Sequence, residues 1–232
     1  MTMKPDFFER LLLLPLFQGI GRNEFLEIAE RIRIGFQKKA KDVEFICQDS
    51  FCDSLYFVLD GELCARRVSD DRNYVFFEWM NLPMVIQPEC LFGLRTRYSR
   101  SFQATGTVYL FELEKPAVRD ILFNYPTFRI NYLNLVSTQM QQTAGFLWKR
   151  IPQSVEERFI HFLRIRSLRP AGRKELKIEM IPLSEELGTT RLNVSKMLKG
   201  LRDAGLIEMK RGKIIIPSFE NLLSRRMEQS LV

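Results

Sequence analysis

The most restrictive pattern in this chain lies in residues 183–207, which read LSEELGTTRLNVSKMLKGLRDAGLI. Pro182 opens a short helix, because a proline in the first turn loses no hydrogen bond. Gly188 permits a tight turn after it, and Thr189 or Thr190 can cap a second helix. Two short helices joined by a glycine turn predict a helix-turn-helix.

The second helix of this motif separates an apolar face from a polar one. Val194, Leu198 and Leu201 recur at i, i+4 and i+7, which predicts that they pack against the first helix. The outward positions gather toward the N-terminal end, the end that enters the major groove in DNA-binding motifs. They are Arg191, Leu192, Ser195, Lys196, Lys199 and Asp203.

A basic hairpin follows the second helix. Residues 207–216 are expected to form two strands that turn at Arg211–Gly212, with Lys210, Arg211 and Lys213 at the tip, where cations bind phosphates. The net charge of +7 is uneven: residues 153–232 hold 16 Lys and Arg against 10 Asp and Glu, and residues 1–152 hold 19 against 18. This distribution favours a DNA-binding module joined to a near-neutral domain over a structural helix pair with solvated cations.

The first half of the chain shows a different periodicity. Residues 6–34 have helical spacing, and residues 36–113 contain short strand-like runs separated by turn residues, with Asp60–Gly61 and residues 70–73 as the clearest turns. Such spacing predicts an antiparallel sandwich or barrel, and hence an α+β fold for the chain. The runs are 43–47, 55–59, 74–80 and 107–113.

A long apolar helix is expected over residues 126–149, and a second copy of the chain is the economical partner for it. Ile151–Pro152 interrupts the pattern and predicts a hinge. A helix over 153–169 and a strand over 176–180 lead into the helix-turn-helix. The predicted domains are therefore a sensor barrel with N-terminal helices, a dimerisation helix and a winged helix-turn-helix, at 1–123, 124–151 and 152–232.

In this order of parts the chain resembles the Crp–Fnr family, the catabolite activator and fumarate–nitrate regulators. Residues 55–63 (LYFVLDGEL) look like the barrel signature of the family, residues 88–93 (PECLFG) like the start of its ligand cassette, and residues 124–126 (NYP) like the start of its dimer helix. The resemblance covers nearly the whole chain. It implies a cyclic-nucleotide-binding-like jelly roll, a homodimer and transcription regulation through duplex DNA.

The resemblance also implies roles for residues of the second helix. The family usually has Arg-Glu where this chain has Arg191-Leu192, and a basic residue at Lys196, so Arg191 and Lys196 are the expected base readers. Leu192 cannot accept a hydrogen bond from cytosine, but it can contact a thymine methyl group, so the usual half-site of the family does not carry over. The expected phosphate contacts are Thr190, Asn193, Ser195, Lys199, Lys210, Arg211 and Lys213.

A cyclic-nucleotide pocket is only partly preserved. Arg100-Ser101 matches the phosphate-binding pair of the family, and Gly93 and Thr143 match two further pocket positions. Leu94 stands where the family has the ribose-binding Glu, the loop to Arg100 is short, and Ala144 follows Thr143 where a Ser is usual. We therefore expect a different effector or none, with a cyclic-nucleotide-responsive regulator as the alternative.

Other classes of function find weaker support. Cys47, Cys52 and Cys64 are scattered over predicted strands, which argues against an iron–sulfur cluster and for reduced thiols, and no metal site is expected. The single histidine, His161, lies in the predicted helix on the DNA-binding side, where we expect an ordinary surface or core histidine and not a haem ligand. With one histidine and no phosphate-binding glycine loop, an enzyme is not expected. A ligand-binding or docking module without DNA binding is the second alternative.

The expected partners follow from this interpretation. Two subunits joined along 126–149 would present their recognition helices about 34 Å apart, so a near-palindromic operator is expected. RNA polymerase is a further candidate partner. The longest apolar run, residues 11–17, is far shorter than the roughly 20 residues that a bilayer needs, so we expect a cytoplasmic protein with no membrane partner.

Overall fold

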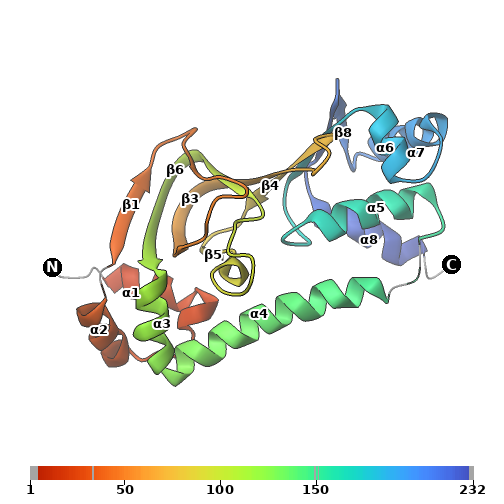
Figure 1. Ribbon diagram of the computed structural model, residues 1–232. Coiled ribbons are helices and arrows are strands. Elements are labelled where there is room, and N and C mark those ends of the chain that lie inside the picture. The colour runs from red at the N-terminus through yellow and green to blue at the C-terminus, as the bar shows by residue number, and fades with distance from the viewer. Residues whose placement is uncertain (1–4, 33, 149, 151, 230–232) are drawn as a thin grey trace. The chain divides into compact units, whose positions relative to one another are not determined.

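The computed structural model describes residues 5–32, 34–148, 150 and 152–229, and its elements are labelled in Figure 1. The chain divides into two compact units. The first comprises residues 1–63 and 81–145 and is called the sensor unit after the function predicted for it above; the second comprises residues 64–80 and 146–232 and is called the DNA-binding unit for the same reason. The predicted hinge at Ile151–Pro152 lies partly outside the described residues, as does Lys149 at the end of the predicted dimer helix.

The sensor unit begins with helices. They are α1 (Pro5–Leu12), the 3-10 turn η1 (Pro15–Phe17) and α2 (Arg22–Arg31), so the predicted helical segment is confirmed, with breaks at residues 13–14, directly before Pro15, and at residues 18–21. Phe17 anchors them to the sheet, with ring centroids 5.3 Å from Phe57 and 5.7 Å from Phe128. Phe57 and Phe111 stack at 4.6 Å beneath it, and α1, α2 and α3 gather at one end of the strands (Figure 1).

The strands of the sensor unit pair antiparallel, as the alternating runs predicted. The long strand β6 (Ser101–Glu114) pairs with β1 (Gly35–Lys39), with β2 (Glu44–Ile46) and with β3 (Ser54–Val68). β5 (Met84–Ile86) pairs with the other side of β3. The result is the barrel-like antiparallel sheet that was expected.

One predicted turn is wrong. Asp60–Gly61 lies inside β3, which continues for 15 residues. Gly61 has φ +117°, and a Cβ atom there would lie 2.1 Å from the carbonyl oxygen of Thr107 on β6. The glycine allows β3 and β6 to approach closely and does not reverse the chain. The turn at residues 70–73 is confirmed.

Helical elements complete the sensor unit. The 3-10 turn η2 (Pro88–Cys90) precedes β6, and α3 (Lys115–Asp120) and η3 (Leu122–Asn124) follow it. The predicted long helix is α4 (Pro126–Leu147), which carries Phe128 and Tyr132 on its buried side. The hydroxyl of Tyr132 donates to the carbonyl oxygen of Pro88 over 2.6 Å and ties α4 to η2.

The DNA-binding unit contains a small antiparallel sheet and four helices in its described residues. The strands are β4 (Tyr74–Met80), β7 (Lys174–Ile178), β8 (Glu208–Lys210) and β9 (Lys213–Ile216), in the order β4-β7-β9-β8. The helices are α5 (Val155–Arg166), α6 (Met180–Glu186), α7 (Arg191–Asp203) and α8 (Phe219–Gln229). Phe159, Leu176 and Phe219 lie at the centre of its apolar core.

Two predicted boundaries in this unit are corrected. The strand predicted over 176–180 is β7 at 174–178, because Met180 already begins α6. Pro182 is consequently the third residue of α6 and does not open the helix, a position where its missing N–H still costs no intrahelical bond. None of the described helices is both long and apolar enough to span a membrane.

Candidate DNA-binding surface

The turn between α6 and α7 has the geometry that the sequence predicted. Gly188 adopts φ +56°, the left-handed conformation that favours glycine. Thr190 is the N-cap of α7, and its side-chain oxygen accepts a hydrogen bond from the Asn193 amide over 3.3 Å. The Asn193 side chain donates to Thr189 Oγ1 over 3.2 Å. Both threonines and Asn193 therefore fix the first turn of the helix.

The inner face of α7 is packed as expected. Val194, Leu198 and Leu201 are fully buried and belong to one apolar cluster with Leu183 and Leu187 of the preceding helix. Loss of solvent contact at all three positions stabilises one orientation of α7 on α6. The helix-turn-helix is thus a rigid support for the residues on its outer face.

The outer face of α7 is open to solvent. Its first half presents two cations, Arg191 and Lys196, on either side of Leu192, which is 63% exposed. Among the described residues, no carboxylate forms a salt bridge with either cation within 4 Å. Other exposed polar residues of α7 include Asn193, Ser195 and Lys199 and, at its C-terminal end, the predicted outward residue Asp203.

A groove of about 360 Å³ separates the start of α7 from the hairpin of β8 and β9. Arg191 of α7 and Lys210 and Arg211 of the hairpin line it, together with Glu179. Lys213 also lines the groove, but its ammonium lies 2.8 Å from Glu175, which is almost buried. Lys210 and Arg211 are the two exposed cations of the hairpin tip, whereas Lys213 is held by an ion pair.

Arg158 of α5 was missed by the sequence analysis. Its Nη1 donates to the carbonyl oxygen of Leu187 over 2.8 Å and to that of Gly188 over 3.0 Å. These hydrogen bonds hold the backbone of the turn between α6 and α7 in place. Ser154 and Glu157 form a capping box that begins α5, a pattern that predicts the helix but not the contact of Arg158 with the turn.

The predicted ligand residues of the sensor unit lie in unlike surroundings. Arg100 and Ser101 are buried at the start of β6, and Ser101 Oγ accepts from the Gln48 amide over 3.0 Å. Gly93 has φ +96° in an exposed loop. Thr143 is exposed on α4 and donates to the carbonyl oxygen of Gln139 over 3.0 Å. Leu94, in the position of the absent ribose ligand, is fully exposed.

Glu89 of η2 lies in the electrostatic field of Arg100. The surrounding protein desolvates its carboxylate and raises its pKa, although part of the side chain remains exposed. Hydrogen bonds from Gln87 and Gln139 and the positive charge of Arg100 act in the opposite direction. The region where an anionic ligand would meet Arg100 therefore already contains a carboxyl group.

The cysteines do not form a ligand set in the described part of the chain. All four are free thiols; Cys52, Cys64 and Cys90 are buried and Cys47 is exposed. Burial raises the pKa of Cys64 to about 11 and that of Cys90 to about 12, so both stay protonated at neutral pH. No group of three or more His, Cys, Asp or Glu residues suited to a metal ion occurs within the described ranges.

Comparison with known proteins agrees with this geometry. Residues 157–225 match the family model of the Crp-like helix-turn-helix domain. The sensor domain of the transcriptional regulator DNR from Pseudomonas aeruginosa superposes with a TM-score of 0.51 at 15% identity, covering 63% of this chain and 97% of that domain. The catabolite activator protein of Thermus thermophilus gives a TM-score of 0.49 at 18% identity, covering 94% and 100%. No curated protein matches the sequence.

The two matches support the two predicted parts of the chain to different extents. Residues 157–225 form a Crp-like helix-turn-helix domain, and 63% of the chain shares the fold of the DNR sensor domain. The surface of α7 described above lies inside the matched domain. The chain is therefore identified, through its Crp-like helix-turn-helix domain, as a DNA-binding transcription regulator.

Proposed function

We propose that this regulator binds a near-palindromic operator as a homodimer and reads each half-site with Arg191 and Lys196. The observation that carries this proposal is the exposed, cationic first half of α7 on a fully packed helix-turn-helix. Arginine and lysine donate to guanine O6 and N7 in the major groove. Leu192, between them, offers an apolar contact to a thymine methyl group.

The homodimer is supported by an apolar seam on α4. Ile130, Leu133 and Met140 are 54%, 54% and 73% exposed. With the small exposed residues Ser137 and Ala144 they follow the 3-4-3-4 spacing of a coiled-coil face. A 22-residue helix with such a seam gains stability when a second copy covers it. A dimer also explains why the operator would be nearly palindromic.

The effector proposed for the sensor unit is not a standard cyclic nucleotide. Leu94 supplies no acceptor for a ribose hydroxyl, and Glu89 places a carboxyl group in the field of Arg100. A second anion beside that carboxylate would be repelled when both are charged. A regulator that responds to a cyclic nucleotide is the alternative, and calorimetric titration with cyclic AMP and cyclic GMP separates the two.

The place of action and a further partner follow from DNA binding. The cytoplasm is the compartment in which a regulator of this type meets duplex DNA. RNA polymerase is the proposed second macromolecular partner, and copurification of the polymerase on operator DNA that carries the regulator would test this contact.

The test of the proposal is DNA binding by the full chain. Genomic fragments retained by the protein define the operator, and fluorescence anisotropy then compares Arg191→Ala and Lys196→Ala with the parent. Each change should weaken operator binding about 10-fold and reduce discrimination at one base pair. Arg202→Ala is the matched control, because Arg202 lies on the same helix but pairs with Asp203 at 2.9 Å. Equal losses in all three variants would contradict the assignment of the base readers.

A further inference from the structure

The hairpin at residues 64–80 comes from the middle of the sensor sequence but belongs to the DNA-binding unit. Its second strand, β4, pairs antiparallel with β7 over five positions, from Tyr74 opposite Ile178 to Glu78 opposite Lys174. β4 thereby becomes a fourth strand of the sheet that carries the wing. Without it, β7 would be an open edge next to the core.

A buried ion pair joins the two strands. The ammonium of Lys174 lies 2.6 Å from Glu78 Oε1, and both side chains are inaccessible to solvent. The same carboxylate accepts hydrogen bonds from the backbone amides of Leu168 and Arg169, at 2.8 and 2.9 Å. Glu78 thus holds β7 through Lys174 and the segment before it through the amides of Leu168 and Arg169.

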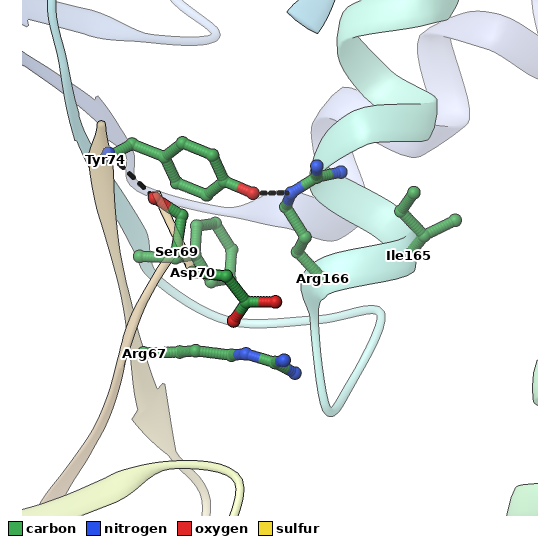
Figure 2. A pocket seen from close by; sticks show the side chains of 7 residues that line it. Arg67, Ser69, Asp70, Tyr74, Ile165 and Arg166 are labelled. Atoms are coloured by element: carbon green, nitrogen blue, oxygen red, sulfur yellow. Dashed lines mark hydrogen bonds between the residues drawn. The ribbon is translucent and has the colours of Figure 1, made fainter. Parts of the chain in front are cut away.

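Apolar and aromatic contacts extend the connection toward the helix-turn-helix. Phe76 is buried in the same cluster as Leu176 and the core residues of α7. Arg166 of α5 donates to the hydroxyl of Tyr74 over 2.7 Å (Figure 2) and pairs with Glu186 of α6 at 2.9 Å. One arginine therefore bonds both the hairpin and the first helix of the motif.

Separation of the hairpin from β7 would be costly. It would leave Lys174 in an apolar interior without its counter-ion, and a buried charge that has lost its partner strongly destabilises a protein. It would also expose Phe76 and the unpaired backbone of β7.

We propose that hairpin 64–80 is a permanent part of the DNA-binding unit and that Glu78 is a positioning residue for the helix-turn-helix. The inference rests on the DNA binding assigned above. The chain passes between the two units at residues 63–64, 80–81 and 145–146. A conformational change in the sensor unit would therefore be transmitted to α7 through both ends of the hairpin as well as through α4.

A reversible crosslink tests whether the hairpin stays in place. Val75 and Lys177 are register partners on β4 and β7, so their Cα atoms lie about 4.5–5.5 Å apart, within the span of a disulfide. The full-length Val75→Cys, Lys177→Cys protein, with Cys47→Ser to remove the exposed thiol, should bind operator DNA within about 2-fold of its reduced form when oxidised. A loss of 10-fold or more on oxidation that dithiothreitol reverses would overturn the proposal.

If the reduced protein does not bind any duplex that the parent binds, the two substitutions themselves disturb the unit, and the Glu78 variants described below decide the proposal instead. If the parent does not bind DNA, the proposed function fails instead. The two failures are therefore distinguishable.

Substitution of Glu78 tests its positioning role. Glu78→Gln should lower operator affinity at least 10-fold, while Glu62→Gln, the same chemical change at an exposed position of β3, should leave it unchanged. The pair Glu78→Leu, Lys174→Met removes both charges and should restore thermal stability. It still lacks the acceptor for the Leu168 and Arg169 amides, so the ratio of operator to non-specific affinity should remain at least 5-fold below the parent. Full recovery of that ratio, or an unaffected Glu78→Gln protein, would refute the role.

Discussion

The guanidinium of Arg158 donates a hydrogen bond to the carbonyl oxygen of Gly188 over 3.0 Å. The donor belongs to the first helix of the DNA-binding unit, and the acceptor belongs to the turn that aims the recognition helix. A second bond from the same nitrogen reaches Leu187. The orientation of α7 thus depends on a residue 30 positions earlier in the sequence.

Arg158→Gln should therefore weaken operator binding although residue 158 lies outside the predicted DNA contacts. Loss of charge-assisted bonds to two backbone carbonyls should lower the free energy of unfolding by about 1.5–3 kcal/mol. Chemical denaturation and anisotropy measure the two effects. Arg158→Lys keeps the charge but loses the fork geometry, and it should be intermediate. Unchanged stability and binding in Arg158→Gln would contradict the clamp.

Gly188→Ala should destabilise the protein by about 1–2 kcal/mol, because φ +56° is unfavourable for a residue with a Cβ atom. Gly200 is the control within α7. It is helical with open space around the position of a Cβ atom, so Gly200→Ala should stabilise the protein by about 0.5–1 kcal/mol. Thermal unfolding of both variants should show shifts of opposite sign. A stabilising Gly188→Ala would mean that the turn has another conformation.

The three cations of the wing should not be equivalent. Lys210→Ala and Arg211→Ala should each weaken binding to all duplexes alike and reduce the slope of log K against log salt by about 1. Lys213→Ala should have a smaller effect on the slope, because its ammonium is paired with Glu175. It should instead cost stability, since Glu175 is 6% exposed and would lose a counter-ion. Identical salt slopes for the three variants would contradict this distinction.

Charges placed in the seam of α4 should prevent dimer formation. Leu133→Glu with Met140→Glu introduces carboxylates at two exposed seam positions that would face their own copies in a parallel dimer. Light scattering should report a monomer, and operator affinity should fall by 100-fold or more, on the order of the gain from linked binding. Gln141→Glu and Gln142→Glu, on exposed positions beside the seam, serve as controls and should remain dimeric. A parent protein that is monomeric at micromolar concentration would rule out the dimer.

Glu89 should make the stability of the sensor unit depend on pH. Its pKa is raised in the folded protein, first by desolvation, so the folded state binds the proton more tightly than the unfolded state. Stability is then highest below the unfolded pKa and decreases as the pH rises through the folded pKa. Glu89→Gln should raise the melting temperature at pH 7 and remove this part of the pH dependence. A melting curve of the variant that still falls over this range would assign the effect to another group.

Local patterns predicted much of this molecule. The apolar positions 194, 198 and 201, the cap at Thr190 and the glycine turn are all encoded within one short segment, and the structure confirms them. The long helix and the alternating strands of the sensor unit were readable for the same reason, because helix and strand periods repeat within a few residues.

The features that were missed depend on pairing between distant segments. Asp60–Gly61 has the composition of a turn, and only the position of Thr107 on β6 shows why a glycine continues the strand instead. The pairing of Tyr74–Met80 with β7 joins residues about 100 positions apart, and no local period encodes it. The clamp by Arg158 is invisible for the same reason. Such contacts are fixed by the packed core and not by the residues of either segment alone.

The exposed leucine at the start of the recognition helix has a consequence for the cell that houses this protein. On the proposed readout, Leu192 selects for a methyl group where a glutamate would select for an amino group. A regulator with glutamate at this position would then bind the promoters of this protein poorly. This protein would in turn bind the promoters of such a regulator poorly. One hydrophobic side chain would thus keep two regulators of the same fold from binding each other's promoters.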